Sequence, residues 1–62
     1  MLNPGDKVHF YESITELNVV MIVRYALSYA ASGEVTYLCC YQDDNHVVQN
    51  IEALESELTL VP

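Results

Sequence analysis

Cationic side chains are nearly absent from this chain of 62 residues. Lys7 and Arg24 stand against nine aspartate and glutamate residues, which gives a formal net charge of −7 at pH 7. Because Lys and Arg normally supply the affinity for phosphate backbones, this balance argues against direct binding of nucleic acid. The acidity then has two interpretations. It is either a solubilising surface or a mimic that occupies the basic groove of a nucleic-acid enzyme.

Glycine and proline are also scarce, with two of each, whereas 52% of the residues are apolar. This composition is not that of a disordered or low-complexity segment. A chain this short buries only roughly 60% of its unfolded surface on folding, so residues 1–62 are expected to form one domain. Natural domains of this size often need a disulfide, a metal or a second copy for stability.

Cysteine occurs only as the adjacent pair Cys39 and Cys40. Successive side chains of an extended chain point to opposite faces, so these thiols are badly placed to bridge each other. No positively charged segment followed by an apolar run opens the sequence, which does not favour secretion. The longest apolar stretch, Val19 to Val23, is far shorter than the ~20 residues of a membrane helix. We therefore expect a cytoplasmic protein with free thiols and no membrane segment.

Residues that commonly carry chemistry are few and poorly spaced. Neither a CxxC nor an HxxxH spacing is present, so no metal site is predicted. Cys39 or Cys40 could pair with His46 for nucleophilic catalysis, but a domain of this size has little room for a substrate pocket. The acidic clusters lack the glycine-containing loop of about a dozen residues that is typical of calcium sites. We expect no enzyme, no cofactor and no metal.

Turn-forming residues at 3–6, 32–33 and 43–45 divide the chain into short segments. Residues 52–57 are typical of a single helical or 3-10 turn. The segments predicted as strands share alternating apolar side chains or β-branched and aromatic residues. They are 7–11, 17–29, 35–42, 46–51 and 58–61.

Residues 14–32 also allow a helical interpretation. Ser13-Ile14-Thr15-Glu16 fits a capping box, and Gly33 fits a helix C-terminal cap. A helix here would have no coherent apolar stripe, because its polar residues scatter around the helical wheel. Apolar residues at every second position from Leu17 to Tyr29 favour a long strand instead.

The predicted fold is all-β, a small five-stranded barrel with one short helical or 3-10 turn before the last strand. Pro4-Gly5-Asp6-Lys7-Val8, the central meander and Glu55-Ser56-Glu57-Leu58 resemble the small SH3-like barrels of short phage and bacterial proteins of unknown role. The resemblance spans nearly the whole chain and implies a fold rather than an activity. No tryptophan is present to form a proline-binding groove, so recognition of proline motifs is not implied.

Four tyrosines lie on the two strands of the predicted central hairpin: Tyr25, Tyr29, Tyr37 and Tyr41. A core of this size does not easily hold four tyrosines with their hydroxyls satisfied, and tyrosine is enriched where proteins meet. They are predicted to form a partner-binding face. The alternative is that they line the interior with their hydroxyls at the rim. The acidic residues form further contact candidates: Asp43, Asp44, Glu52, Glu55 and Glu57.

Val20 and Ile22 lie between apolar residues of the same strand, so both faces of residues 19–23 are apolar. Something must cover the second face, and another copy of the chain is the simplest cover. The sequence therefore predicts a homodimer through Val20 and Ile22.

Two functions fit these features. The first is a small acidic adaptor or regulator of phage or mobile-element origin that binds a protein through its tyrosine-bearing face. The second is an acidic, nucleic-acid-mimicking inhibitor of a host nucleic-acid or defence enzyme. A structural component of a larger assembly is a third interpretation.

Overall fold

The chain folds into one antiparallel sheet in a computed structural model that describes residues 1–29 and 33–62, with only the backbone described at 28 and 29. The sheet consists of β1 (Lys7–Glu12), β2 (Leu17–Tyr29), β3 (Val35–Gln42), β4 (Val48–Leu54) and β5 (Leu58–Leu60). One 3-10 turn, η1 (Glu55–Glu57), precedes β5. The predicted all-β class and the turn before the last strand are confirmed. The helical interpretation of residues 14–32 is wrong over 17–29, where β2 lies.

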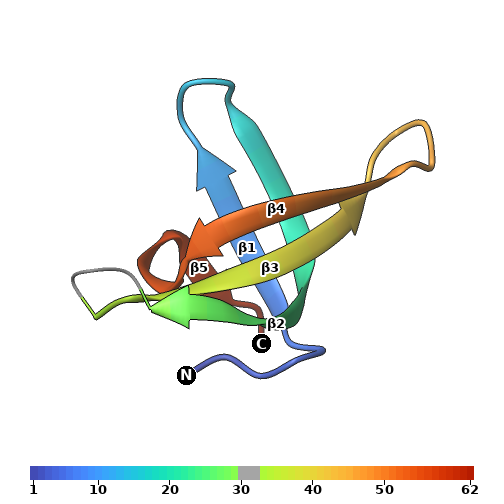
Figure 1. Cartoon of the computed structure of the whole chain (residues 1–62). Helices are drawn as coiled ribbons and strands as arrows, with labels where there is room; N and C mark the ends of the chain where they lie inside the picture. Colours follow the sequence, from blue (N-terminus) through green and yellow to red (C-terminus); the bar gives the residue numbers. More distant parts are fainter. Residues whose placement is uncertain (30–32) are drawn as a thin grey trace.

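The strand order is β4-β3-β2-β1-β5, so the chain meanders through four strands and its last strand returns to pair with the first. This pairing sets Val8 opposite Leu60 and Phe10 opposite Leu58. Within the described residues no ladder joins β4 to β5, so the sheet is open and the predicted closed barrel is not seen. In Figure 1, β3 and β4 cross the direction of β1 at a steep angle, as expected of a strongly curved sheet.

Alternation along the strands places the core on the concave side of this sheet. Val8 on β1 lies opposite Met21 on β2, and both side chains are fully buried. The core residues are small to medium in size apart from two aromatic rings: they are Val8, Phe10, Met21, Val23, Val35, Tyr37, Cys39 and Ala53. Burial of this apolar surface is the main source of stability in a domain of this size.

β2 pairs with a different strand over each half of its length, because it bends. Its first half pairs with β1 and its second half with β3. The register with β3 shifts between Val23 and Tyr25 and again between Ala26 and Ser28. Such bulges bend a strand and increase its twist, and Figure 1 shows β2 turning sharply before its arrowhead. The predicted turn at Ser32-Gly33 lies partly outside the described residues, but the pairing of β2 with β3 is confirmed.

β4 begins and ends later than the predicted range of 46–51. The turn before it is longer because the backbone N–H of Asp43 donates to the carbonyl of Val47 at 2.9 Å, and His46 adopts a positive φ of 62°. At the other end the ladder continues to Leu54, which lies opposite Thr36. The 3-10 turn is therefore confined to the last residues of the segment predicted for it.

Candidate interaction surface

The convex side of β2, β3 and β4 carries a mixed apolar and charged patch. Directly opposed residues of an antiparallel ladder share a face, so the members of the patch follow from the register. This patch is named the outer face and consists of Ile22, Arg24, Tyr25, Leu38, Cys40, Asn50 and Glu52.

One row of the outer face runs from Ile22 on β2 through Cys40 on β3 to Asn50 on β4. The side chain of Ile22 is 37% exposed and Cys40 is half-buried. Val20, which points to the same side of β2, is 52% exposed and lies opposite His9 of β1. The two candidates for self-association are therefore both at the surface, and Ile22 lies beside a thiol.

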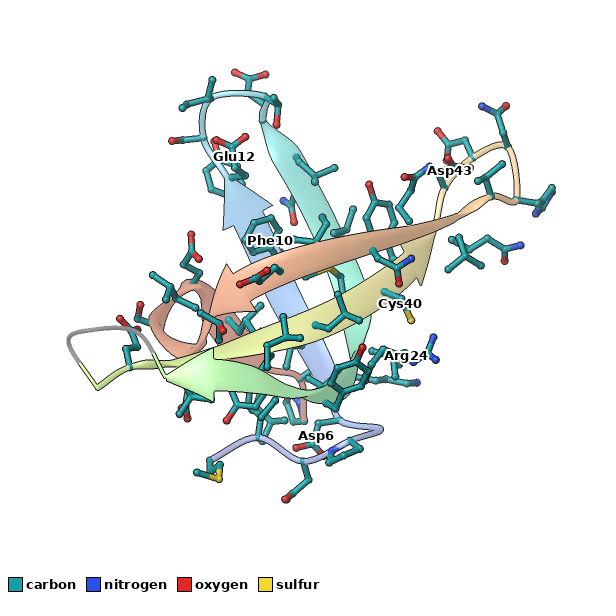
Figure 2. The ribbon with its side chains drawn as sticks, in the orientation of Figure 1. Asp6, Phe10, Glu12, Arg24, Cys40 and Asp43 are labelled. Carbon is teal, nitrogen blue, oxygen red and sulfur yellow. The ribbon has the colours of Figure 1, made fainter. Side chains whose placement is uncertain are left out.

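The second row is shaped by the first bulge of β2. A bulge sets two residues against one on the partner strand, so Arg24 and Tyr25 both face Leu38 of β3. Leu38 in turn lies opposite Glu52 of β4. Both Arg24 and Glu52 are exposed, and they flank the half-buried Leu38 from opposite sides. Figure 2 shows Arg24 and Cys40 directed to the periphery, whereas Phe10 lies between the ribbons of β1 and β4.

Within residues 1–29 and 33–62, neither Arg24 nor Glu52 of the outer face forms an ion pair. Neighbouring strands lie about 4.8 Å apart, so the backbones at Arg24 and Glu52, on either side of β3, lie about 10 Å apart. Among the described residues, the ion pair that the structure shows joins the N-terminal ammonium of Met1 to Glu55 at 3.7 Å. In the described part of the chain, this row therefore holds a cation, Arg24, and an anion, Glu52, that each lack an ion-pair partner.

The tyrosines do not share one face in the structure. Tyr25 is 49% exposed on the outer face, whereas Tyr37 is 1% exposed and Tyr41 packs against the core from the opposite side. The bulge after Val23 causes this separation, because it reverses the alternation that the first half of β2 establishes. The side chain of Tyr29 lies outside the described residues.

Tyr37 lies in the interior with its hydroxyl at the rim, as the alternative interpretation of the tyrosines predicts. Its hydroxyl accepts a hydrogen bond from the backbone N–H of Leu2 at 3.2 Å and donates one to Glu55 at 3.5 Å. A buried tyrosine whose hydroxyl reaches two partners at the rim satisfies both the apolar ring and the polar end. It also ties the N-terminal segment to η1.

Asp43 is occupied by the turn between β3 and β4. Its carboxylate accepts hydrogen bonds from the backbone N–H of Asn45 at 2.9 Å, from that of Val47 at 3.0 Å and from the Gln49 amide at 3.0 Å. The bond from Val47, followed by that from Gln49, lowers the pKa of Asp43 below its ordinary value. Asp44, the next residue, is exposed.

The acids near η1 are also used within the chain. Glu57 accepts the backbone N–H of Leu54 at 2.8 Å, while Glu55 binds the Tyr37 hydroxyl and the N-terminal ammonium. Of the five acidic contact candidates, Glu52 therefore lies on the outer face. Asp43 and Glu57 bind backbone N–H groups of turns, Glu55 binds the Tyr37 hydroxyl and the N-terminus, and Asp44 is exposed in the turn before β4.

Sequence reasoning did not single out Glu12, which organises the turn between β1 and β2. Its carboxylate accepts hydrogen bonds from the Ile14 backbone N–H at 2.9 Å, from the Thr15 backbone N–H at 2.8 Å and from the Thr15 hydroxyl. These bonds, with that of the Thr15 hydroxyl first, lower the pKa of Glu12. The available signal was an acid placed directly before a Ser and Thr turn, where side chains commonly bind backbone N–H groups.

The two cysteines have opposite environments, as expected for neighbours on a strand. Cys39 is fully buried, and this burial, together with the adjacent Cys40, raises the pKa of its thiol. Both thiols are free. A buried thiol with a raised pKa behaves as a small apolar side chain, which leaves Cys40 as the accessible one.

Over residues 1–29 and 33–62 the structure encloses no pocket and groups no three His, Cys, Asp or Glu side chains around a possible metal position. That same part of the chain also contains no helix of the length and apolarity required to cross a membrane. No protein family, curated protein or solved structure matches the chain.

Proposed function

We propose that this chain is a small acidic protein-binding module, an adaptor or regulator without catalytic activity, and that it binds through the outer face. The fold that accompanies this proposal is a small SH3-like barrel. It is supported by the meander of four strands, the 3-10 turn before β5 and the return of β5 to β1. The free thiols favour the cytoplasm as its location, and the resemblance to the SH3-like barrels of short phage and bacterial proteins favours a phage or mobile-element origin.

One observation supports the binding surface. In the row across β2, β3 and β4, the half-buried Leu38 lies between Arg24, next to the exposed Tyr25, and Glu52, and among the described residues neither charge has an ion-pair partner. Aromatic residues and arginine are the types most enriched in protein interfaces, and an apolar centre with a charged rim is the usual arrangement. Val20, on the same side of β2 as Ile22, extends this apolar surface.

The alternative function, mimicry of nucleic acid, draws less support. A mimic needs carboxylates free to meet basic residues of its target, whereas Asp43, Glu55 and Glu57 bind groups within the chain. The net charge of −7 is what favours this alternative.

The two functions predict a different salt dependence of the binding affinity and a different site at which substitutions weaken binding. The chain is immobilised, bound proteins are identified, and the affinity for the identified protein is measured at increasing salt. Tyr25→Ala on the outer face is compared with Asp44→Asn in the turn. The proposed function predicts that Tyr25→Ala weakens binding by about tenfold or more, in the range of interface hot spots, with little effect of salt.

Mimicry predicts the reverse result. Binding would then fall steeply with salt, because the contacts of a mimic are charge pairs, and DNA or RNA would compete for the target. Asp44→Asn would weaken that binding more than Tyr25→Ala. Such a pattern would refute the outer face as the binding surface.

A further inference from the structure

We infer that the first protein that the outer face binds is a second copy of this chain, in a dimer whose two-fold axis runs along β3. The inference rests on the proposed function and specifies its partner. It is carried by the positions of Arg24 and Glu52, which flank Leu38 in one row of the three-stranded layer formed by β2, β3 and β4.

The symmetry follows from the strand order. β3 is the middle strand of this layer, so a rotation of 180° about an axis along β3 places β2 of one copy over β4 of the other. Each row of residues in one copy then faces the same row in the other copy. Arg24 of each copy faces Glu52 of its partner, and the pair occurs twice.

The middle of the same contact is apolar. Leu38 and Cys40 both point outward from β3, so in this arrangement each lies next to its own counterpart in the second copy. Ile22 and Tyr25 lie on either row beside them and complete the apolar centre. Apolar residues at the centre and reciprocal charge pairs at the rim match the general anatomy of protein interfaces.

The net negative charge limits which surfaces of two copies can meet. With nine acids and two cationic side chains, most contacts between two copies would bring carboxylates together. Arg24 lies on the outer face, and Lys7 lies opposite Ile22 on the same side of the sheet. The convex side that includes the outer face therefore carries Arg24 and Lys7 together with Glu52, so a second copy that docks there meets cations as well as an acid.

Sedimentation over a range of protein concentrations tests this arrangement with three variants, Arg24→Glu, Glu52→Arg and the two combined. Each single variant places like charges opposite each other twice, so self-association should weaken by about tenfold or more. The double variant restores opposite charges in the swapped order and should return to within about threefold of the unchanged chain.

Glu52→Arg is the decisive variant, because it makes the net charge less negative. If only overall repulsion between acidic copies mattered, Glu52→Arg would strengthen self-association. If Arg24 of each copy pairs with Glu52 of the other, Glu52→Arg should instead weaken self-association. Strengthening by Glu52→Arg, or failure of the double variant to recover, overturns the inference.

A measurement without charge variants covers the case in which one of them fails to fold. A short bismaleimide should join Cys40 of the two copies, and Cys40→Ser should abolish the covalent dimer. Absence of cross-linking, together with a monomer at all concentrations, overturns the inference. If Tyr25→Ala still releases a bound protein from such a monomer, the proposed function stands and only the identity of the partner fails.

Discussion

Neighbouring residues on the same strand of this protein differ completely in environment. Met21 and Cys39 are fully buried in the concave core, whereas Ile22 and Cys40, one position further along, lie on the outer face. The residue types are similar on the two sides, so composition alone does not tell residues that stabilise the core from residues that are available for binding. The side of the strand on which a residue lies distinguishes the two roles. The core side is already covered by other strands, whereas the outer side is available to a partner.

The largest expected difference is in the reactivity of the two thiols. In dilute solution Cys40 should react with a small disulfide reagent at least about 100-fold faster than Cys39, because reaching a core thiol requires an opening that costs about 3 kcal/mol or more. Burial also raises the pKa of Cys39, which lowers its thiolate fraction. Absorbance during modification measures both phases, with Cys40→Ser and Cys39→Ser to assign them. Equal rates would show that the two sides of β3 do not differ.

Truncation of neighbouring side chains on β2 is the next test. Met21→Ala should lower the free energy of unfolding by about 3 kcal/mol, since it leaves a cavity in the core. Ile22→Ala, at 37% exposure, should cost less than about 1 kcal/mol. Urea denaturation in dilute solution measures both. Comparable losses would mean that the outer face contributes to the core of the single chain.

Loss of one hydroxyl distinguishes the interior tyrosine from the exposed one. Tyr37→Phe should cost about 1 kcal/mol, because the Leu2 N–H then loses its acceptor and Glu55 loses a donor. Tyr25→Phe serves as the matched control and should be nearly neutral for stability. The free energies of unfolding are compared under the same conditions. A neutral Tyr37→Phe would contradict the role of the hydroxyl in fixing the N-terminal segment.

The smallest expected effect concerns the adjacent acids of the turn before β4. The carboxylate of Asp43 accepts three hydrogen bonds, so its pKa is lowered in the folded state and the unfolded state binds more protons. Its contribution is therefore fully present above the ordinary carboxyl pKa of about 4 and is lost as the pH falls through the lowered value. Asp43→Asn should destabilise at pH 7 and progressively less below about pH 4. Asp44→Asn should change little at either pH, and equal behaviour of the two variants would refute the assignment.

The alternating pattern was sufficient to predict that there are five strands, the two apolar faces of the first half of β2, and the surface position of Val20 and Ile22. It was insufficient after Val23, because a bulge inserts a residue without any compositional signal and reverses which side Tyr25 occupies. The roles of Asp43 and Glu12 were also beyond the pattern, since an exposed acid and an acid that binds its own turn look alike in sequence. The outer face required the register of β3 and β4, which joins residues distant along the chain.

The central claim is that the outer face is covered by a partner, and Cys40 reports on this directly. Its rate of modification is measured as a function of protein concentration, with Arg24→Glu as the variant that weakens the contact. The account predicts that the rate falls as the concentration rises, and that Arg24→Glu moves this fall to higher concentration. A rate that is the same at every concentration, and unchanged when an identified partner protein is added, would contradict it.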